Sequence, residues 1–118
     1  MATYSRIPLS GSTDFRGIKV VQTATAGTTI HTAQASASLA DHVHLFANHS
    51  YSAAILLTLE WGGVTVPDDN ITVTLEADAG LIRLTPPEGL SIRNSLVVKA
   101  FADQANQVAI FGHVIRES

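Results

Sequence analysis

Hydrophobic and polar residues alternate with a period of two along several short stretches of this chain. In residues 71–77 (ITVTLEA) the odd positions are apolar and the even positions carry Thr or Glu. Residues 43–48 (VHLFAN) place Val43, Leu45 and Ala47 on one face and His44 and Phe46 on the other, with His42 continuing that second face. Successive side chains of a strand point to opposite faces of a sheet, so both stretches predict strands with one buried face.

Turn signals separate these strands at short, regular intervals. Residues 53–61 (AAILLTLEW) are the most apolar and predict a strand through the centre of the core, ended by Gly62 and Gly63. The strands predicted from apolar and β-branched runs are 18–24, 28–33, 43–48, 53–61, 71–77, 81–85, 90–92, 96–102 and 107–116. No stretch shows a helical period. The pattern predicts an all-β fold, a β-sandwich or jelly roll of about eight strands, with an up-and-down barrel as the alternative.

The first 17 residues differ from the rest. Ser, Thr, Gly and Pro interrupt any period there, and Ile7, Leu9 and Phe15 are the apolar anchors. This composition predicts an extended N-terminal arm over 1–17, followed by a single domain over 18–118. Such an arm either lies across a neighbouring subunit or is a poorly ordered terminus. A glycine inside the last strand, Gly112, predicts a bulge or a close backbone approach.

Composition narrows the class further. The chain has 118 residues, a formal charge of −3, 46% hydrophobic and only 14% charged residues, and no Cys. It therefore has no disulfide or thiolate metal site, and its charge argues against a nucleic-acid partner. No apolar run is long enough for a membrane span, and the start lacks the apolar region of a signal peptide. A small domain so poor in charge indicates that other chains cover part of its surface.

Candidate chemistry is sparse. His42 and His44 share one face of a predicted strand, with Asp41 and His49 nearby, and this spacing could hold a metal ion. The alternative is a set of surface histidines at a subunit contact. His31 and His113 are isolated and are interpreted as structural. No G-x-S-x-G elbow or P-loop occurs, and we predict no cofactor, no metal and no catalytic residues.

Two residues near the centre of the sequence invite a structural or a functional interpretation. Trp61 precedes two glycines, so it is either a contact for another chain or a core side chain that ends its strand. Glu60 precedes it in the most apolar segment. It could be partly buried, or it could point to solvent or pair with Arg83 or Lys99.

Several segments together resemble one family. They are 6–20 (RIPLSGSTDFRGIKV), the EWGG of 60–63 with the PDD of 67–69, the LVVKAFA of 96–102 and the closing NQVAIFGHVIR of 106–116. The chain is similar to the head-decoration, or cement, proteins of tailed bacteriophages, including marine siphophages. The resemblance implies a β-rich, non-enzymatic homotrimer that binds the major capsid protein on the outer surface of the virion, after assembly in the host cytoplasm.

These observations select candidate contact residues and leave alternatives open. The side chains expected to touch another subunit or the capsid are Ile7, Leu9, Phe15, His42, His44 and Trp61. A trimeric fibre, spike-base or tail component would also be β-rich. A carbohydrate-binding β-sandwich would use exposed aromatics such as Trp61, Tyr4 and Tyr51, and a small jelly-roll metalloenzyme would use His42 and His44.

Overall fold

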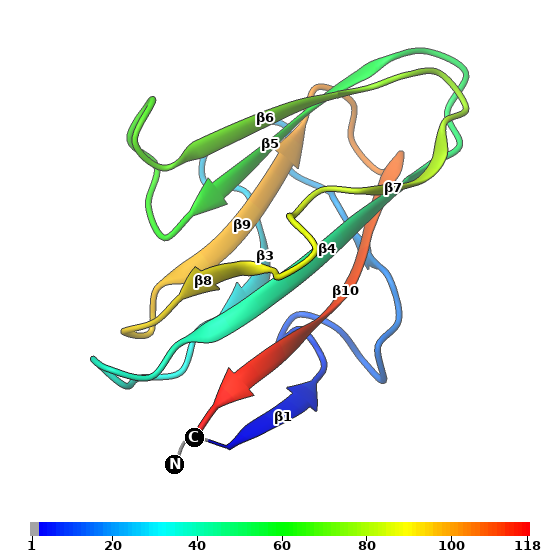
Figure 1. Ribbon diagram of the computed structural model, residues 1–118. Coiled ribbons are helices and arrows are strands. Elements are labelled where there is room, and N and C mark those ends of the chain that lie inside the picture. Colours follow the sequence, from blue (N-terminus) through cyan, green and yellow to red (C-terminus); the bar gives the residue numbers. More distant parts are fainter. Residues whose placement is uncertain (1–2) are drawn as a thin grey trace.

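The computed structural model describes residues 3–118 and contains ten β-strands and no helix in that range (Figure 1). Met1 and Ala2, the start of the predicted arm, lie outside the described residues. The strands form two sheets in which every pairing is antiparallel. The all-β prediction is confirmed, and the two sheets are compatible with a β-sandwich. The strand count is higher than about eight, because one strand lies within the predicted arm.

The larger sheet has six strands built around the two longest ones. These are β4 (Asp41–His49) and β10 (Val108–Glu117), paired from Val108 opposite His49 to Arg116 opposite Asp41. The other four are β1 (Tyr4–Ile7), β2 (Ile18–Lys19), β7 (Gly80–Arg83) and β8 (Leu90–Ile92). Strands β1 and β2 pair with β10, while β7 and β8 pair with β4.

The smaller sheet has four strands in the order β3-β9-β5-β6. Their bounds are β3 (Thr28–Thr32), β5 (Ile55–Trp61), β6 (Asn70–Leu75) and β9 (Val97–Ala102). Strand β5 lies between two partners, and its inward residues Ile55, Leu57 and Leu59 are completely buried. The prediction that this segment runs through the core is therefore confirmed.

The core is continuous and comes from nearly every strand. In β4 the odd positions from 41 to 49 are buried and the even positions are half-buried, as the alternation predicts. The fully buried large apolar side chains are Leu9, Val20, Ile30, Val43, Leu45, Ile55, Leu57, Leu59, Leu75, Val98, Ile110 and Val114. In β6 the alternation is weaker. Leu75 is buried, but Ala77 lies beyond the strand and is exposed.

The N-terminal segment packs on its own chain. Strand β1 pairs with β10 from Tyr4 opposite Glu117 to Ile7 opposite Val114, and the backbones of Thr3 and Ser118 bond to each other. Figure 1 shows β1 beside β10, close to the C-terminus. A short polar strand such as this resembles a loop in sequence, because only its distant partner defines it.

The predicted strand over 18–24 ends at Lys19 in the structure, and residues 22–27 form a separate segment. Only Ile18 and Lys19 pair with β10, and the chain then reaches the four-stranded sheet, where Gln22 accepts a bond from the amide of Ala102. Gly27 packs so tightly that a Cβ would lie 2.6 Å from the Ala100 carbonyl carbon. The segment therefore covers part of the outward face of this sheet.

Gly112 marks a close approach between the two central strands. A Cβ at this position would lie 1.9 Å from the carbonyl oxygen of His44 on β4. The pairing of β4 with β10 runs through Gly112 without a register shift. Of the two sequence-based alternatives, the structure shows the close approach and not a bulge. Residues 3–118 contain no helix long and apolar enough to cross a membrane.

Candidate functional site

Two of the six predicted contact residues, His42 and His44, lie on the outward face of the six-stranded sheet. Residues directly opposite in an antiparallel pair share a face, so the outward positions of β4 continue onto its neighbours. This face, called the outer face below, comprises Tyr4, Arg6, Lys19, His42, His44, Phe46, Asn48, Leu81, Arg83, Ser91, Ala109, Phe111, His113, Ile115 and Glu117. Tyr4 and Leu81 are each 62% exposed and Phe111 is 36% exposed. Large apolar or aromatic side chains are therefore exposed at both ends of this face.

Two histidines stack at the centre of the outer face. The rings of His44 and His113 lie 4.6 Å apart between centroids, at an interplanar angle of 13°. Burial lowers the pKa of both imidazoles, and the positive charges of Arg83 and Arg6 lower each pKa further. The pair is thus uncharged at neutral pH. Gly89 lies against it, since a Cβ there would come within 2.9 Å of His44 Nε2.

His42 is held at one end of the outer face. Its Nδ1 bonds to Ser91 Oγ over 2.9 Å and its Nε2 to Glu117 Oε2 over 3.1 Å. Glu117 also accepts the amide of Ala40, and this bond and the one from His42 lower the pKa of its carboxyl. His42 therefore joins β8, β4 and the end of β10.

The histidines do not converge on a metal ion. His49 lies on the core face of β4 and is completely buried, opposite to His42 and His44. Asp41 also points inward. Within residues 3–118, no group of three or more His, Cys, Asp or Glu side chains is placed to hold a metal.

The remaining predicted contact residues are spread over the fold. Phe15 is 46% exposed in the loop before β2. Ile7 is half-buried against the core, and Leu9 is completely buried within its own chain, so it offers no surface to a partner. Trp61 also packs against the core, and its Nε1 donates to the carbonyl of Ser91 on the other sheet over 3.1 Å.

A buried polar network crosses the space between the sheets. Arg116 on β10 donates to both carboxylate oxygens of Asp41, each over 2.8 Å. His31 on β3 bonds to Asp41 through Nε2 over 2.7 Å, and its Nδ1 accepts the amide of Ser10 over 3.0 Å. Because Nδ1 accepts from an N–H, the neutral tautomer with its proton on Nε2 fits both bonds. The network joins both sheets and the N-terminal segment.

The pKa values of this network follow from burial and pairing. Burial alone would raise the pKa of Asp41, but bonds from Arg116 and His31, with the Arg116 charge, hold that pKa below its ordinary value. Burial lowers the pKa of His31 despite the bond to Asp41. The bond to Asp41 raises the pKa of Arg116. At neutral pH the network is a charged Arg–Asp pair beside a neutral imidazole.

The network contains Ser, His and Asp, but its geometry is not that of a nucleophile and its base. His31 is 1% exposed, and it bonds to the backbone amide of Ser10. The Ser10 hydroxyl instead accepts the amide of Thr32. A nucleophile needs its hydroxyl on the imidazole and access for substrate. The structural interpretation of His31 agrees with these contacts. The sequence analysis grouped its partner Asp41 with His42, His44 and His49, and the structure bonds Asp41 to His31 instead.

Glu60 is completely buried on the outward side of β5, and the segment 22–27 explains how. Thr25 donates its hydroxyl to one carboxylate oxygen and the amide of Gly27 donates to the other over 2.7 Å. Lys99 lies opposite in the strand pairing, but these bonds come from the covering segment. The structure therefore agrees with the alternative in which Glu60 is buried, and not with the alternative in which it points to solvent.

Comparisons with protein-family models, with curated proteins and with solved structures gave no match. A functional assignment for this chain therefore depends on its own residues.

Proposed function

We propose that this chain is a structural, non-enzymatic capsid decoration protein. It acts as a homotrimer that binds the major capsid protein on the outer surface of a virion and joins neighbouring capsomers. The resemblance of four sequence segments to phage head-decoration proteins suggests the role. The proposal includes the finer fold class, a jelly-roll sandwich. The six-stranded and four-stranded antiparallel sheets support this class.

The observation that carries the proposal is the hollowed end of the outer face, where the exposed ring of Tyr4 lies beside His42 and Ile115. Tyr4 is 62% exposed, and Ile115 and His42 are half-buried beside it. A hollow of about 340 Å³ lies between Tyr4, Ile115 and the turn at Gly89. In a chain with only 14% charged residues, such a surface suits contact with other copies.

A trimer contact at this end has a physical advantage on a shell. Each copy engages its capsid site weakly, but three linked copies bind together, so the second and third contacts form at high effective concentration. A closed three-fold assembly also leaves no free copy of the contact to extend into a filament.

The test is the solution mass of the purified chain, followed by sedimentation with undecorated shells of its virion. We expect three times 12.5 kDa by light scattering, and co-sedimentation with the shells. Tyr4→Glu places a charge in the proposed contact and should lower both the mass and the binding. Leu56→Glu is the matched control, because Leu56 is 46% exposed on the other sheet.

Two results would contradict the proposal. One is a chain that remains a monomer at high concentration and does not sediment with shells. The other is an equal loss of assembly in the Tyr4 and Leu56 variants, which would place the contact elsewhere.

A further inference from the structure

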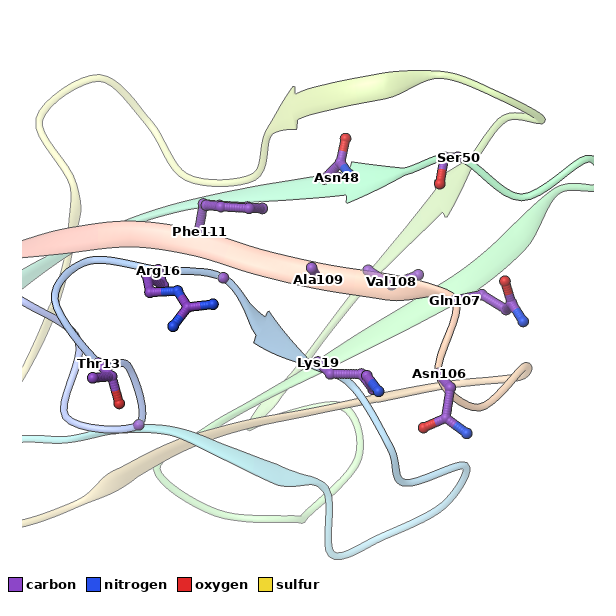
Figure 2. Close-up of a pocket in the computed structure, with 12 residues that line it drawn as sticks. Thr13, Arg16, Lys19, Asn48, Ser50, Asn106, Gln107, Val108, Ala109 and Phe111 are labelled. Carbon is purple, nitrogen blue, oxygen red and sulfur yellow. The ribbon is translucent and has the colours of Figure 1, made fainter.

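Another hollow lies at the opposite end of the outer face from Tyr4. It has a volume of about 620 Å³. Four segments supply its walls: the loop before β2, β2 itself, the end of β4 and the start of β10 with the turn that precedes it (Figure 2). This size suits a ligand of one or two sugar rings, since ligand pockets measure roughly 300–1,000 Å³.

The charge of this pocket is opposite to that of the chain. Arg16 and Lys19 line it, and no acidic residue does, although the chain has a formal charge of −3. Neither cation forms an ion pair with any residue in the described range 3–118. Two cations without acidic partners in a concave site attract an anionic group.

The uncharged lining is suited to hydroxyl groups. Asn48, Asn106 and Gln107 contribute three amides, and Thr13 and Ser50 contribute hydroxyls. Figure 2 shows Asn48 and Ser50 coming from the β4 side, and Asn106 and Gln107 coming from the turn before β10. Each amide both donates and accepts, so adjacent amides can satisfy vicinal hydroxyls, which also do both.

Phe111 provides the one aromatic wall. It is 36% exposed, and its ring lies so close to Gly17 that a Cβ there would be 2.7 Å from Phe111 Cζ. A side chain at position 17 would therefore have to displace this ring. The exposed part of the ring can cover the C–H surface of a pyranose, and burying that apolar area is favourable.

The loops around the pocket are held by their own backbone bonds. The amide of Asn106 donates to the Val20 carbonyl over 3.0 Å, and the amide of Arg16 donates to the Thr13 carbonyl over 3.0 Å. The amide of Gly11 donates to Ile30 over 3.0 Å. A pocket already ordered before binding loses less conformational entropy when a ligand enters.

We propose that this pocket binds an acidic carbohydrate, a pyranose that carries a carboxylate or a sulfate. Arg16 and Lys19 hold the acidic group, the amides of Asn48 and Gln107 take the ring hydroxyls, and Phe111 covers the C–H face. Inorganic phosphate would occupy a small part of the volume and leave the amides unused. A nucleotide base gains most from stacking, which one partly covered ring supplies poorly.

The test is a titration of the isotope-labelled full chain, followed by amide chemical shifts. The probes are glucuronate, glucose 6-sulfate, glucose, adenosine monophosphate and inorganic phosphate, each to about 10 mM so that a millimolar Kd is detected. We expect both acidic sugars to shift the amides of Lys19, Asn106 and Phe111. Glucose, which lacks the acidic group, should bind at least about tenfold more weakly than glucuronate.

A charge-matched pair of variants separates the pocket from the overall charge. Arg16→Gln with Lys19→Gln should weaken glucuronate binding about tenfold or more. Arg93→Gln with Lys99→Gln removes the same charge outside the pocket and should bind like the unmodified chain. The proposal is overturned if glucose, phosphate or the nucleotide binds as tightly as glucuronate. It is also overturned if glucuronate shifts no amide signal, or if both double variants lose the same affinity for glucuronate. None of these results depends on trimer formation.

Discussion

Replacing Asp41 by Asn tests the buried network most directly. The substitution keeps the shape of the side chain but exchanges one carboxylate oxygen for an NH₂ group. Oδ2 accepts bonds from His31, from the Arg116 guanidinium and from the amide of Gln34, while Oδ1 accepts only Arg116 Nε. The best arrangement of the amide therefore puts its oxygen at Oδ2 and faces its NH₂ toward Arg116 Nε, which is also a donor.

The cost follows from what remains buried. Removing one partner of a buried ion pair costs about 3–5 kcal/mol. Arg116 is 33% exposed and can turn toward water, which reduces the loss, whereas His31 keeps its acceptor. We expect the free energy of unfolding to fall by about 2–3 kcal/mol, out of the roughly 5–15 kcal/mol typical of a domain. With a urea m-value near 1.5 kcal/mol/M, the midpoint falls by about 1.3–2 M.

Urea unfolding followed by the fluorescence of Trp61, the single tryptophan, measures this loss. Asp68→Asn is the control, since Asp68 is an exposed turn carboxylate. The folded-state pKa of Asp41 is lowered, so its contribution is complete above the unfolded value near 3.9 and disappears as pH falls through the folded value. The gap between wild type and Asp41→Asn should therefore close in acid. A loss under about 0.5 kcal/mol, or a gap that does not change with pH, would refute the reasoning.

Three further predictions follow from other contacts. Gly112→Ala should lower the free energy of unfolding by about 3 kcal/mol or more, because the new Cβ would meet a carbonyl oxygen. Gly80→Ala has open space around it and only the strain of φ +73°, so it should cost about 1–2 kcal/mol. Equal losses of stability in urea unfolding would contradict this. Glu60→Ala should speed hydrogen exchange at the Gly27 amide while β9 stays protected, and unchanged exchange would show that the carboxylate does not hold segment 22–27. The pKa of His31 is lowered by burial, so the unfolded chain takes up a proton first as pH falls below about 6.5. His31 alone should lower the stability there by up to about 1.4 kcal/mol per pH unit, and His44 and His113, whose pKa values are also lowered, act in the same direction. A urea midpoint that rises as pH falls through this range would contradict the sign.

The period of apolar residues along the sequence predicted the strands that bury one face, and it predicted which side chains lie on that face. The inward set of β4 and the apolar centre of β5 were read from local pattern alone, because burial of one face leaves a period of two. The same reasoning separated His42 and His44 from the core. What an isolated strand exposes to its two sides is therefore largely a local property.

The contacts that define the candidate site were not local. Asp41 was grouped with His42 because they are adjacent, yet its partners are His31 on the other sheet and Arg116 at the far end of the chain. Glu60 is buried by a segment about 35 residues earlier. The pocket with Arg16 at its wall joins residues 11–19 to residues 106–111 and had no sequence signal. Only the pairing of the strands brings these residues together.

The buried network also sets a timescale. The bond between Arg116 and Asp41 spans 75 positions of sequence, and the bond between His31 and Ser10 requires the first segment to be in place. Contacts of such separation are expected to form after the transition state of folding, once loop closure has already been overcome. Weakening them should then leave the folding rate nearly unchanged and accelerate unfolding. The network would thus govern how long each folded molecule lasts before it unfolds.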